Sequence, residues 1–244
     1  MNRLCGGFYL DTSAHAAVAR KVKKDLTLRV YELGSSEYSV FHAFQRSGQH
    51  LVIPRHYGLS LGLPYRDATS GGSCIAYHMQ EPTLRSAQVP FVMDTLSALR
   101  ESRQVTAKAH TGFGKSVVGL EVARRLDTTT LIIVDRDRLV DQWISTATDP
   151  ALFGMDPACV GRVQGDEIDF KGKSVVIAMA QTLFSRDMGE EFYNYFGFMI
   201  WDECKVAGAP VMSSIFFQVN SKYRLGLDAT PHRNDALEKV LRYH

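Results

Sequence analysis

The sequence lacks the features that mark membrane, secreted and disulfide-stapled proteins. No stretch of 18 uninterrupted apolar residues occurs among its 244 residues, which argues against a membrane span. The apolar runs at the N-terminus are too short for the core of a signal peptide. The four cysteines are scattered without a Cys-x-x-Cys pair, so we expect reduced thiols and a cytoplasmic protein, with no disulfide scaffold or zinc site.

Internal repeats, low-complexity tracts and a large net charge are also missing. The hydrophobic content of 45% and the charged content of 22% are ordinary for a globular protein with one large or two modest domains. The net charge of +2 conceals a split, because residues 1–84 hold nine Lys and Arg against six Asp and Glu. This local balance fits a module that binds a polyanion beside a near-neutral module, although chance can also produce it.

Residues 1–82 mix short strand-like runs with one helix-like segment at 13–26, whose first residue, Ser13, can cap the helix. The stretch 66–74 is rich in Ser, Gly and Thr and favours a loop or the start of a linker. We therefore predict a small α+β domain over residues 1–82.

From residue 83 onward, buried-looking apolar runs alternate with helix-like stretches. The runs are apolar on both faces, as strands of a parallel sheet are, and they fall at 103–109, 129–135, 174–180, 196–202 and 223–230. Helix-like segments at 115–126 and 137–147 separate three of them. This alternation predicts an α/β domain over residues 83–244, with helices on both sides of a parallel sheet.

The segment AHTGFGKS, residues 109–116, joins the first of these strands to a helix. Gly112 and Gly114 let successive backbone N–H groups point inward, Lys115 can reach outer phosphates, and Ser116 can ligate magnesium. Ala109 stands where the full phosphate-loop pattern has its first glycine. A flexible turn before a helix is the alternative, but the position between a strand and a helix favours a phosphate-binding loop.

The segment IWDECK, residues 200–205, ends another predicted strand with two carboxylates. If this strand ends beside the loop, Asp202 lies near the magnesium and Glu203 near a water that attacks the γ-phosphate. The alternative is a pair of solvated acids at the end of a strand.

Six motifs in chain order resemble those of the first RecA-like domain of superfamily 2 helicases: LRSAQ (84–88), AHTGFGKS (109–116), LIIVDRDRLVDQW (131–143), VVIAMAQTL (175–183), IWDECK (200–205) and LGLDATPHRND (225–235). Within the superfamily they resemble the branch that includes XPB, restriction-enzyme translocases and phage UvsW-like branch-migration helicases. The resemblance implies a RecA-like P-loop fold that uses ATP and Mg²⁺, preceded by a small accessory domain that we expect to bind DNA.

The resemblance also implies roles for single residues. Arg85 and Gln88 would contact the adenine side of ATP, and Asp202 and Glu203 would be the metal partner and the catalytic base. Phosphates and magnesium would be held by Thr111, Gly112, Phe113, Gly114, Lys115 and Ser116. The resemblance assigns contacts with the nucleic-acid backbone to Arg136, Arg138, Gln181 and Thr182. Plain surface charges are the alternative for the two arginines, and capping of the next helix is the alternative for Gln181 and Thr182.

The sequence departs from the family at two coupling positions. Lys205 stands where the family usually has His, and Asp228 stands where the motif that ends in Thr230 usually has Ser or Thr. The two motifs touch in the family, so the changes predict an ion pair between Lys205 and Asp228. A solvated Lys205 is the alternative.

The resemblance predicts an ATP-dependent DNA helicase or translocase that acts on branched DNA. We expect the second RecA-like domain, which supplies arginine fingers in the family, to be missing from these 244 residues. A duplex-DNA translocase of a restriction or repair system that does not separate strands is the main alternative. A nucleotide-binding module without a DNA role is more remote. The expected location is the cytoplasm, or the host cytoplasm if a phage encodes the protein.

Overall fold

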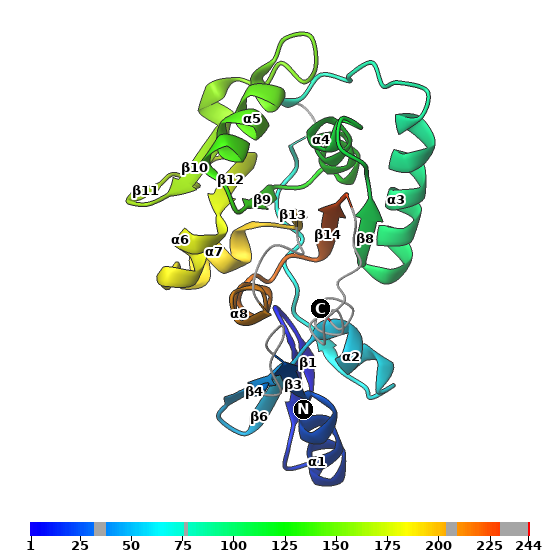
Figure 1. The fold of residues 1–244 in the computed structure, drawn as a ribbon, viewed down its shortest axis with the longest axis vertical. Coiled ribbons are helices and arrows are strands. Elements are labelled where there is room, and N and C mark those ends of the chain that lie inside the picture. The colour runs from blue at the N-terminus through cyan, green and yellow to red at the C-terminus, as the bar shows by residue number, and fades with distance from the viewer. Residues whose placement is uncertain (32–37, 76–77, 204–208, 230–243) are drawn as a thin grey trace. The chain divides into compact units, whose positions relative to one another are not determined.

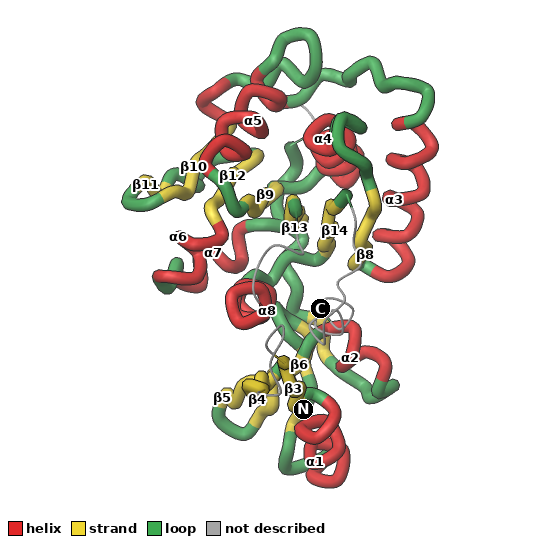
Figure 2. Tube along the Cα trace, viewed as in Figure 1, coloured by secondary structure: helices red, strands yellow, loops and turns green. Residues whose placement is uncertain are grey.

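The computed structural model describes residues 1–31, 38–75, 78–203, 209–229 and 244, and the chain forms two compact units. The first unit comprises Met1–Thr69, Gly208–Asn220 and His232–His244, and the second comprises Ser70–Ala207 and Ser221–Pro231. These units do not coincide with a single boundary at residue 82, because the first ends earlier and takes in a later helix. Figures 1 and 2 show the elements of both units.

The second unit is built on a seven-stranded sheet in the order β11-β10-β12-β9-β13-β14-β8. Neighbouring strands are parallel except for β11, which is antiparallel to β10. The strands span Gln104–Lys108 (β8), Thr130–Val134 (β9), Val160–Gln164 (β10), Glu167–Ile168 (β11), Val175–Met179 (β12), Phe198–Asp202 (β13) and Tyr223–Asp228 (β14). Every residue of β9 and β13 is buried, as expected for strands covered on both faces.

Helices flank this sheet, with α4 and α5 above the strands and α7 below them in the view of Figure 1. They span Gln88–Ser102 (α3), Lys115–Leu126 (α4), Asp137–Thr148 (α5), Ala180–Ser185 (α6) and Gly189–Tyr195 (α7), with a 3-10 turn at Pro157–Cys159. Their apolar sides pack on the sheet in a core that includes Val118, Val140, Trp143 and Ile200. The predicted parallel sheet flanked by helices is confirmed.

The first unit has a five-stranded sheet in the order β5-β6-β2-β1-β7 and a separate hairpin of β3 and β4. The strands span Arg3–Leu4 (β1), Phe8–Asp11 (β2), Thr27–Tyr31 (β3), Tyr38–His42 (β4), Gln45–Ser47 (β5), His50–Ile53 (β6) and Arg66–Asp67 (β7). Its helices are Ala16–Asp25 (α1), Arg55–Ser60 (α2) and Ala209–Gln218 (α8). Phe8, Leu10, Val22, Leu26 and Ile53 are central to its core. Most of this unit, which mixes helices and strands, therefore precedes the parallel sheet in the sequence.

Helix α8 lies between β13 and β14 in the sequence but belongs to the first unit. The Gly6 N–H donates a 2.6 Å hydrogen bond to Asn220 Oδ1, just beyond the end of this helix. A Cβ atom at residue 6 would lie 2.0 Å from the Phe217 carbonyl oxygen, so only glycine permits this approach. Sequence patterns cannot reveal this placement, because it depends on packing between residues about 210 positions apart.

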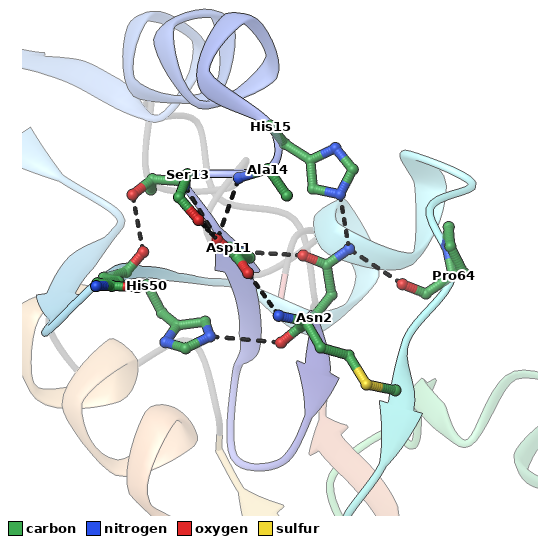
Figure 3. Close-up of polar contacts among 10 residues, drawn as sticks. Asn2, Asp11, Ser13, Ala14, His15, His50 and Pro64 are labelled. Atoms are coloured by element: carbon green, nitrogen blue, oxygen red, sulfur yellow. Dashed lines mark hydrogen bonds and ion pairs between the residues drawn. The ribbon is translucent and has the colours of Figure 1, made fainter.

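A polar network at the N-terminus orders the start of α1 (Figure 3). The Asp11 carboxylate accepts the Ser13 and Ala14 N–H groups at 3.0 and 3.2 Å and the Ser13 hydroxyl at 2.6 Å. The α-amino group of Met1 also binds Asp11, and these hydrogen bonds hold the pKa of the carboxyl well below its ordinary value. The prediction that Ser13 caps α1 was wrong: the helix begins at Ala16, after His15, and the Ser13 side chain is occupied by Asp11.

None of the helices in the described part of the chain is both long enough and apolar enough to cross a membrane. Cys5, Cys74 and Cys159, the cysteines that the structure describes, form no disulfide.

Candidate functional site

The predicted phosphate loop leaves β8 at the carboxyl end of the sheet and leads into α4. The Ala109 N–H donates to the Asp228 carbonyl oxygen at 2.8 Å, so the start of the loop is fixed to the end of β14. Gly114 precedes the first helical residue with φ +87°, a left-handed conformation that favours glycine. The strand, glycine-containing loop and helix therefore follow one another as the sequence predicts.

Arg85 and Gln88 hold this loop from the side. Gln88 Nε2 donates to the Phe113 carbonyl oxygen at 2.8 Å, and the Arg85 guanidinium donates to the carbonyl oxygens of Gly112 and Phe113. A Cβ at Gly114 would lie 2.7 Å from Gln88 Nε2, so the glycine also makes room for these contacts. The structure thus gives both residues a role in shaping the loop, and their contact with adenine stays a prediction.

Two carboxylates lie opposite the loop at the end of β13. Lys115 Nζ lies 3.6 Å from Asp202 Oδ1 and 4.0 Å from Glu203 Oε1. Asp202 is buried, whereas the Glu203 side chain is 29% exposed. Glu203 adopts φ +52°, a strained conformation for a residue with a side chain, and its N–H donates to Asp202 Oδ1 at 3.0 Å. The strand β14 separates β13 from β8, so the acids and the loop follow strands that are not adjacent in the sheet.

A cavity of about 470 Å³ lies between the loop and these acids. Its wall includes Thr111, Gly112, Lys115, Arg138, Asp202 and Glu203. A volume of this size suits a small-molecule ligand, and a cation and backbone N–H groups at a helix start suit its phosphates. Phe113, also predicted for the loop, instead packs its ring against Phe91, with the ring centroids 5.1 Å apart.

The two arginines that we predicted to contact the nucleic-acid backbone lie near this cavity. Arg138 forms part of its wall, and the guanidinium of Arg136 lies 4.0 Å from Glu203 Oε2. Both side chains are exposed and accessible to nucleic acid. Their contact with nucleic acid stays a prediction. The position of Arg138 in the cavity wall favours contact with the phosphates of a bound nucleotide, a role that the motif resemblance did not assign to it.

Helix α5 supplies three further residues near the cavity that our sequence interpretation missed. Gln142 lines the cavity, Trp143 Nε1 donates to Asp202 Oδ2 at 3.0 Å, and Thr146 Oγ1 lies 3.3 Å from Ser116 Oγ. Residues 138, 142 and 146 are four apart and share one helix face. Because α5 follows β9, which neighbours β13, this periodicity could have indicated the site.

The remaining predicted residues lie elsewhere or outside the described residues. Thr182 is buried, and its hydroxyl accepts a hydrogen bond from the Gly165 N–H at 3.0 Å. Its side chain therefore connects α6 to a turn. Gln181 is exposed. Asp228 is buried at the end of β14. Lys205 and Thr230 lie outside the described residues, and the pairing of Lys205 with Asp228 stays a prediction.

The residues at this site fit a magnesium ion that is held jointly with phosphates. Ser116 and Asp202 supply hard oxygen donors and are both buried. Within the described ranges no group of three or more His, Cys, Asp and Glu side chains could hold a metal without other ligands. Mg²⁺ commonly takes one or two protein oxygens together with phosphate oxygens and water, so the small donor set is suitable.

Comparison with known families decides the assignment. Residues 81–233, more than half of the chain, match the family described as type III restriction enzyme, res subunit. The chain belongs to this ResIII family. The ResIII match covers the loop, the acidic pair and α5, and it begins just before Arg85. The prediction of a superfamily 2 helicase domain is confirmed.

Similar proteins include several viral helicases. A protein of Acanthamoeba polyphaga mimivirus named as an ATP-dependent RNA helicase is 26% identical over 92% of this chain and 44% of its own length. Helicase 109L of Invertebrate iridescent virus 3 is 27% identical over 93% of this chain and 73% of its own length. The DNA 3'-5' translocase XPB2 of Sulfurisphaera tokodaii is 30% identical over 74% of this chain and 42% of its own length. The chain thus spans less than half of the first and third of these relatives.

Among solved structures, the UvsW helicase of bacteriophage T4 has a similar fold. The TM-score is 0.62 at 17% identity, with 93% of this chain and 90% of that chain covered. The SWI2/SNF2 ATPase core of Sulfolobus solfataricus matches with a TM-score of 0.50 at 15% identity, over 67% of this chain and 36% of that chain. These similarities confirm the predicted RecA-like fold.

Proposed function

We propose that this ResIII chain is the ATP-binding part of a nucleic-acid translocase that remodels branched DNA at forks or junctions during recombination, replication or repair. One observation carries the ATP-binding part: the carboxylates of Asp202 and Glu203 both lie within 4.0 Å of Lys115 Nζ, at the wall of one cavity beside the phosphate loop. The helicase names of the relatives support the coupling of nucleotide turnover to movement on nucleic acid.

Each side chain has a distinct task in this proposal. Lys115 and the loop N–H groups bind the β- and γ-phosphates, and Ser116 and Asp202 hold the metal. Bound magnesium would neutralise phosphate charge as the γ-phosphate leaves. Glu203, at the more exposed end of the acidic pair, orients a water and accepts its proton. Buried Asp202 cannot reach bulk water as readily, so the two carboxylates divide the work.

The first unit would bind the nucleic acid by charge. Lys21 and Lys24 are exposed on α1, Arg46 and Arg66 are exposed on strands, and Arg29 stacks on the Tyr38 ring at 5.0 Å in the β3–β4 hairpin. Arg55, another of the nine cations in residues 1–84, is instead buried and donates from Nε to the Cys5 carbonyl oxygen. It holds the fold of the unit and is unsuited to a phosphate contact.

The partner of choice is branched DNA, with a second RecA-like domain completing the motor. This step rests on the sequence resemblance and on the fold shared with UvsW. Translocation on duplex DNA without strand separation is the alternative, and the names of the viral relatives make RNA a further one. The cytoplasm, or a host cytoplasm, is the proposed location.

The deciding experiment uses the full-length protein on matched substrates. We expect ATP-dependent dissociation of a four-way DNA junction, and little activity on a blunt duplex or on an RNA duplex of the same sequence. Movement along duplex DNA, detected by triplex displacement without junction dissociation, would favour the translocase alternative. Preferred unwinding of the RNA duplex would replace DNA by RNA as the substrate.

A further inference from the structure

Helix α5 contacts the two side chains that are proposed to hold magnesium. Trp143 donates its indole N–H to Asp202 Oδ2 at 3.0 Å, and Thr146 Oγ1 lies 3.3 Å from Ser116 Oγ. Trp143 and Thr146 are three positions apart on the same helix, so one rigid element reaches both metal-binding oxygens. Nothing in the motif resemblance gives α5 this role.

The bond from Trp143 orients the Asp202 carboxylate. Both residues are buried, so water cannot replace the indole donor. The other oxygen, Oδ1, accepts the Glu203 N–H at 3.0 Å and faces Lys115 Nζ at 3.6 Å. Each carboxylate oxygen therefore has a fixed partner, which holds the plane of the carboxylate and leaves further lone pairs for a cation.

The contact between the two hydroxyls orients Ser116. Thr146 Oγ1 also donates to the Gln142 carbonyl oxygen at 2.8 Å, and a hydroxyl has only one proton to give. When the proton of Thr146 serves that shorter bond, its oxygen can accept the proton of Ser116. The lone pairs of Ser116 are then free for a cation, which is the orientation that a metal ligand requires.

We propose that Trp143 and Thr146 are positioning residues that orient Asp202 and Ser116 for the magnesium–nucleotide complex. The inference rests on the proposed function, because it concerns the metal of the same site. Partners behind metal ligands commonly change metal affinity by roughly tenfold to hundredfold when they are removed.

A purely structural role for Trp143 must be separated from this one. The ring is fully buried against α4, where a Cβ at Gly119 would lie 2.8 Å from Trp143 Cη2. Loss of the ring would therefore leave a cavity and destabilise the unit whatever the indole N–H does. The test must remove the N–H and keep an aromatic ring.

Three variants of the full chain provide this test. Trp143→Phe keeps a ring but removes the donor, and Thr146→Val keeps the shape but removes the hydroxyl. Thr148→Val is the matched control, because the Thr148 hydroxyl donates to the Ile144 carbonyl oxygen of its own helix, at 3.0 Å. Binding of a fluorescent ADP analogue is titrated with Mg²⁺ and compared with binding in excess EDTA. Thermal unfolding of each variant is measured in parallel.

We expect Trp143→Phe to raise the Mg²⁺ concentration for half-maximal nucleotide binding by about tenfold. Thr146→Val should raise it by about threefold, since it removes one neutral hydrogen bond. Affinity in EDTA should stay at the parent value for both, and Thr148→Val should match the parent throughout. A lowered melting temperature with an unchanged Mg²⁺ requirement would overturn the inference and leave Trp143 a packing residue.

The parent protein separates this inference from the proposed function. If the parent bound no nucleotide, or bound it independently of Mg²⁺, the proposed metal site would fail, and the inference with it. If the parent required Mg²⁺ and both variants kept its requirement, only the positioning role would fail. Thr146→Val is a mild change at a half-buried position, so it keeps the test decisive if Trp143→Phe folds poorly.

Discussion

The two units use their charged side chains in different ways. In the second unit, Lys115, Asp202 and Glu203 are at least partly shielded from water, and both carboxylates lie within 4.0 Å of Lys115 Nζ. In the first unit, Lys21 and Lys24 are exposed and have no ion-pair partner in the described part of the chain. Shielded charges act strongly at short range, whereas exposed charges act weakly and are screened by salt. We therefore expect chemistry in the second unit and salt-sensitive binding in the first.

The largest effect should come from Glu203→Gln, measured as ATP turnover of the full-length protein. Removal of a general base costs about 10²–10⁴-fold in rate. Nucleotide affinity should be kept or rise slightly, because the carboxylate lies 4.0 Å from Lys115 Nζ and opposes bound phosphates. Turnover at the parent rate would show that Glu203 is not the base.

Lys115→Ala should have the next largest effect, on nucleotide affinity. A hydrogen bond to a charged group contributes about 1.5–3 kcal/mol, so affinity should fall by up to roughly a hundredfold. Lys108→Ala is the matched control, because Lys108 is exposed on the strand that leads into the same loop. A fluorescent ATP analogue measures both. Equal effects of the two changes would remove the loop lysine from the phosphate site.

Loss of Lys115 also removes the cation beside buried Asp202. A buried charge that loses its partner costs roughly 3–5 kcal/mol, so the melting temperature should fall as well. Lys115→Met removes the same charge but keeps more of the side-chain volume than Lys115→Ala does. Nucleotide affinity and melting temperature are measured for both variants. The two measurements together distinguish a lost phosphate contact from general destabilisation.

Arg138→Ala should give a smaller loss, of about tenfold in ATP affinity, because its guanidinium is exposed and better solvated than Lys115. The measurement is ATP affinity without nucleic acid, followed by DNA affinity without ATP. A loss in the first places Arg138 with the cavity that it lines. A loss confined to DNA affinity would support the motif-based prediction that Arg138 contacts nucleic acid. It would also show that Arg138 does not contact the nucleotide in the cavity.

The sequence predicted the second unit best where structure is local. The apolar strands β9 and β13, the loop before Lys115 and the acids at the end of β13 follow from short patterns. The direction that α5 faces was not predicted, because the motif resemblance assigned Arg136 and Arg138 to nucleic acid. The four-residue spacing of Arg138, Gln142 and Thr146 places one face of this helix at the cavity. The contact of Trp143 with Asp202 joins residues 59 positions apart and has no local signal.

The first unit was harder to predict, because its contacts are non-local. Ser13 matches a helix-capping pattern, yet Asp11 takes its hydroxyl and the helix begins later. Arg55 is one of the cations of residues 1–84, yet it is buried and donates to the carbonyl oxygen of Cys5, 50 positions away. The assignment of α8 to this unit depends on the approach of Gly6 to Phe217. Composition alone cannot reveal such arrangements.

The smallest predicted effect tests the exposed charges of the first unit. Deletion of residues 1–82 would remove the strands and loops that α8 packs with, so loss of activity after such a deletion would be ambiguous. The double change Lys21→Ala and Lys24→Ala is cleaner, because both side chains are exposed on α1. Removal of two phosphate contacts should lower the slope of log affinity against log salt by about 1.8 and reduce junction affinity by about fivefold.

The matched control for this double change removes two exposed cations from the second unit, Arg100 and Lys171. It changes the net charge by the same amount, so an effect of overall charge would appear in both proteins. ATP affinity should stay at the parent value in each. A changed salt slope for α1 alone would place nucleic acid on the first unit. Equal salt slopes in both variants would contradict that placement. The excess of basic residues in residues 1–84 would then have no role in binding.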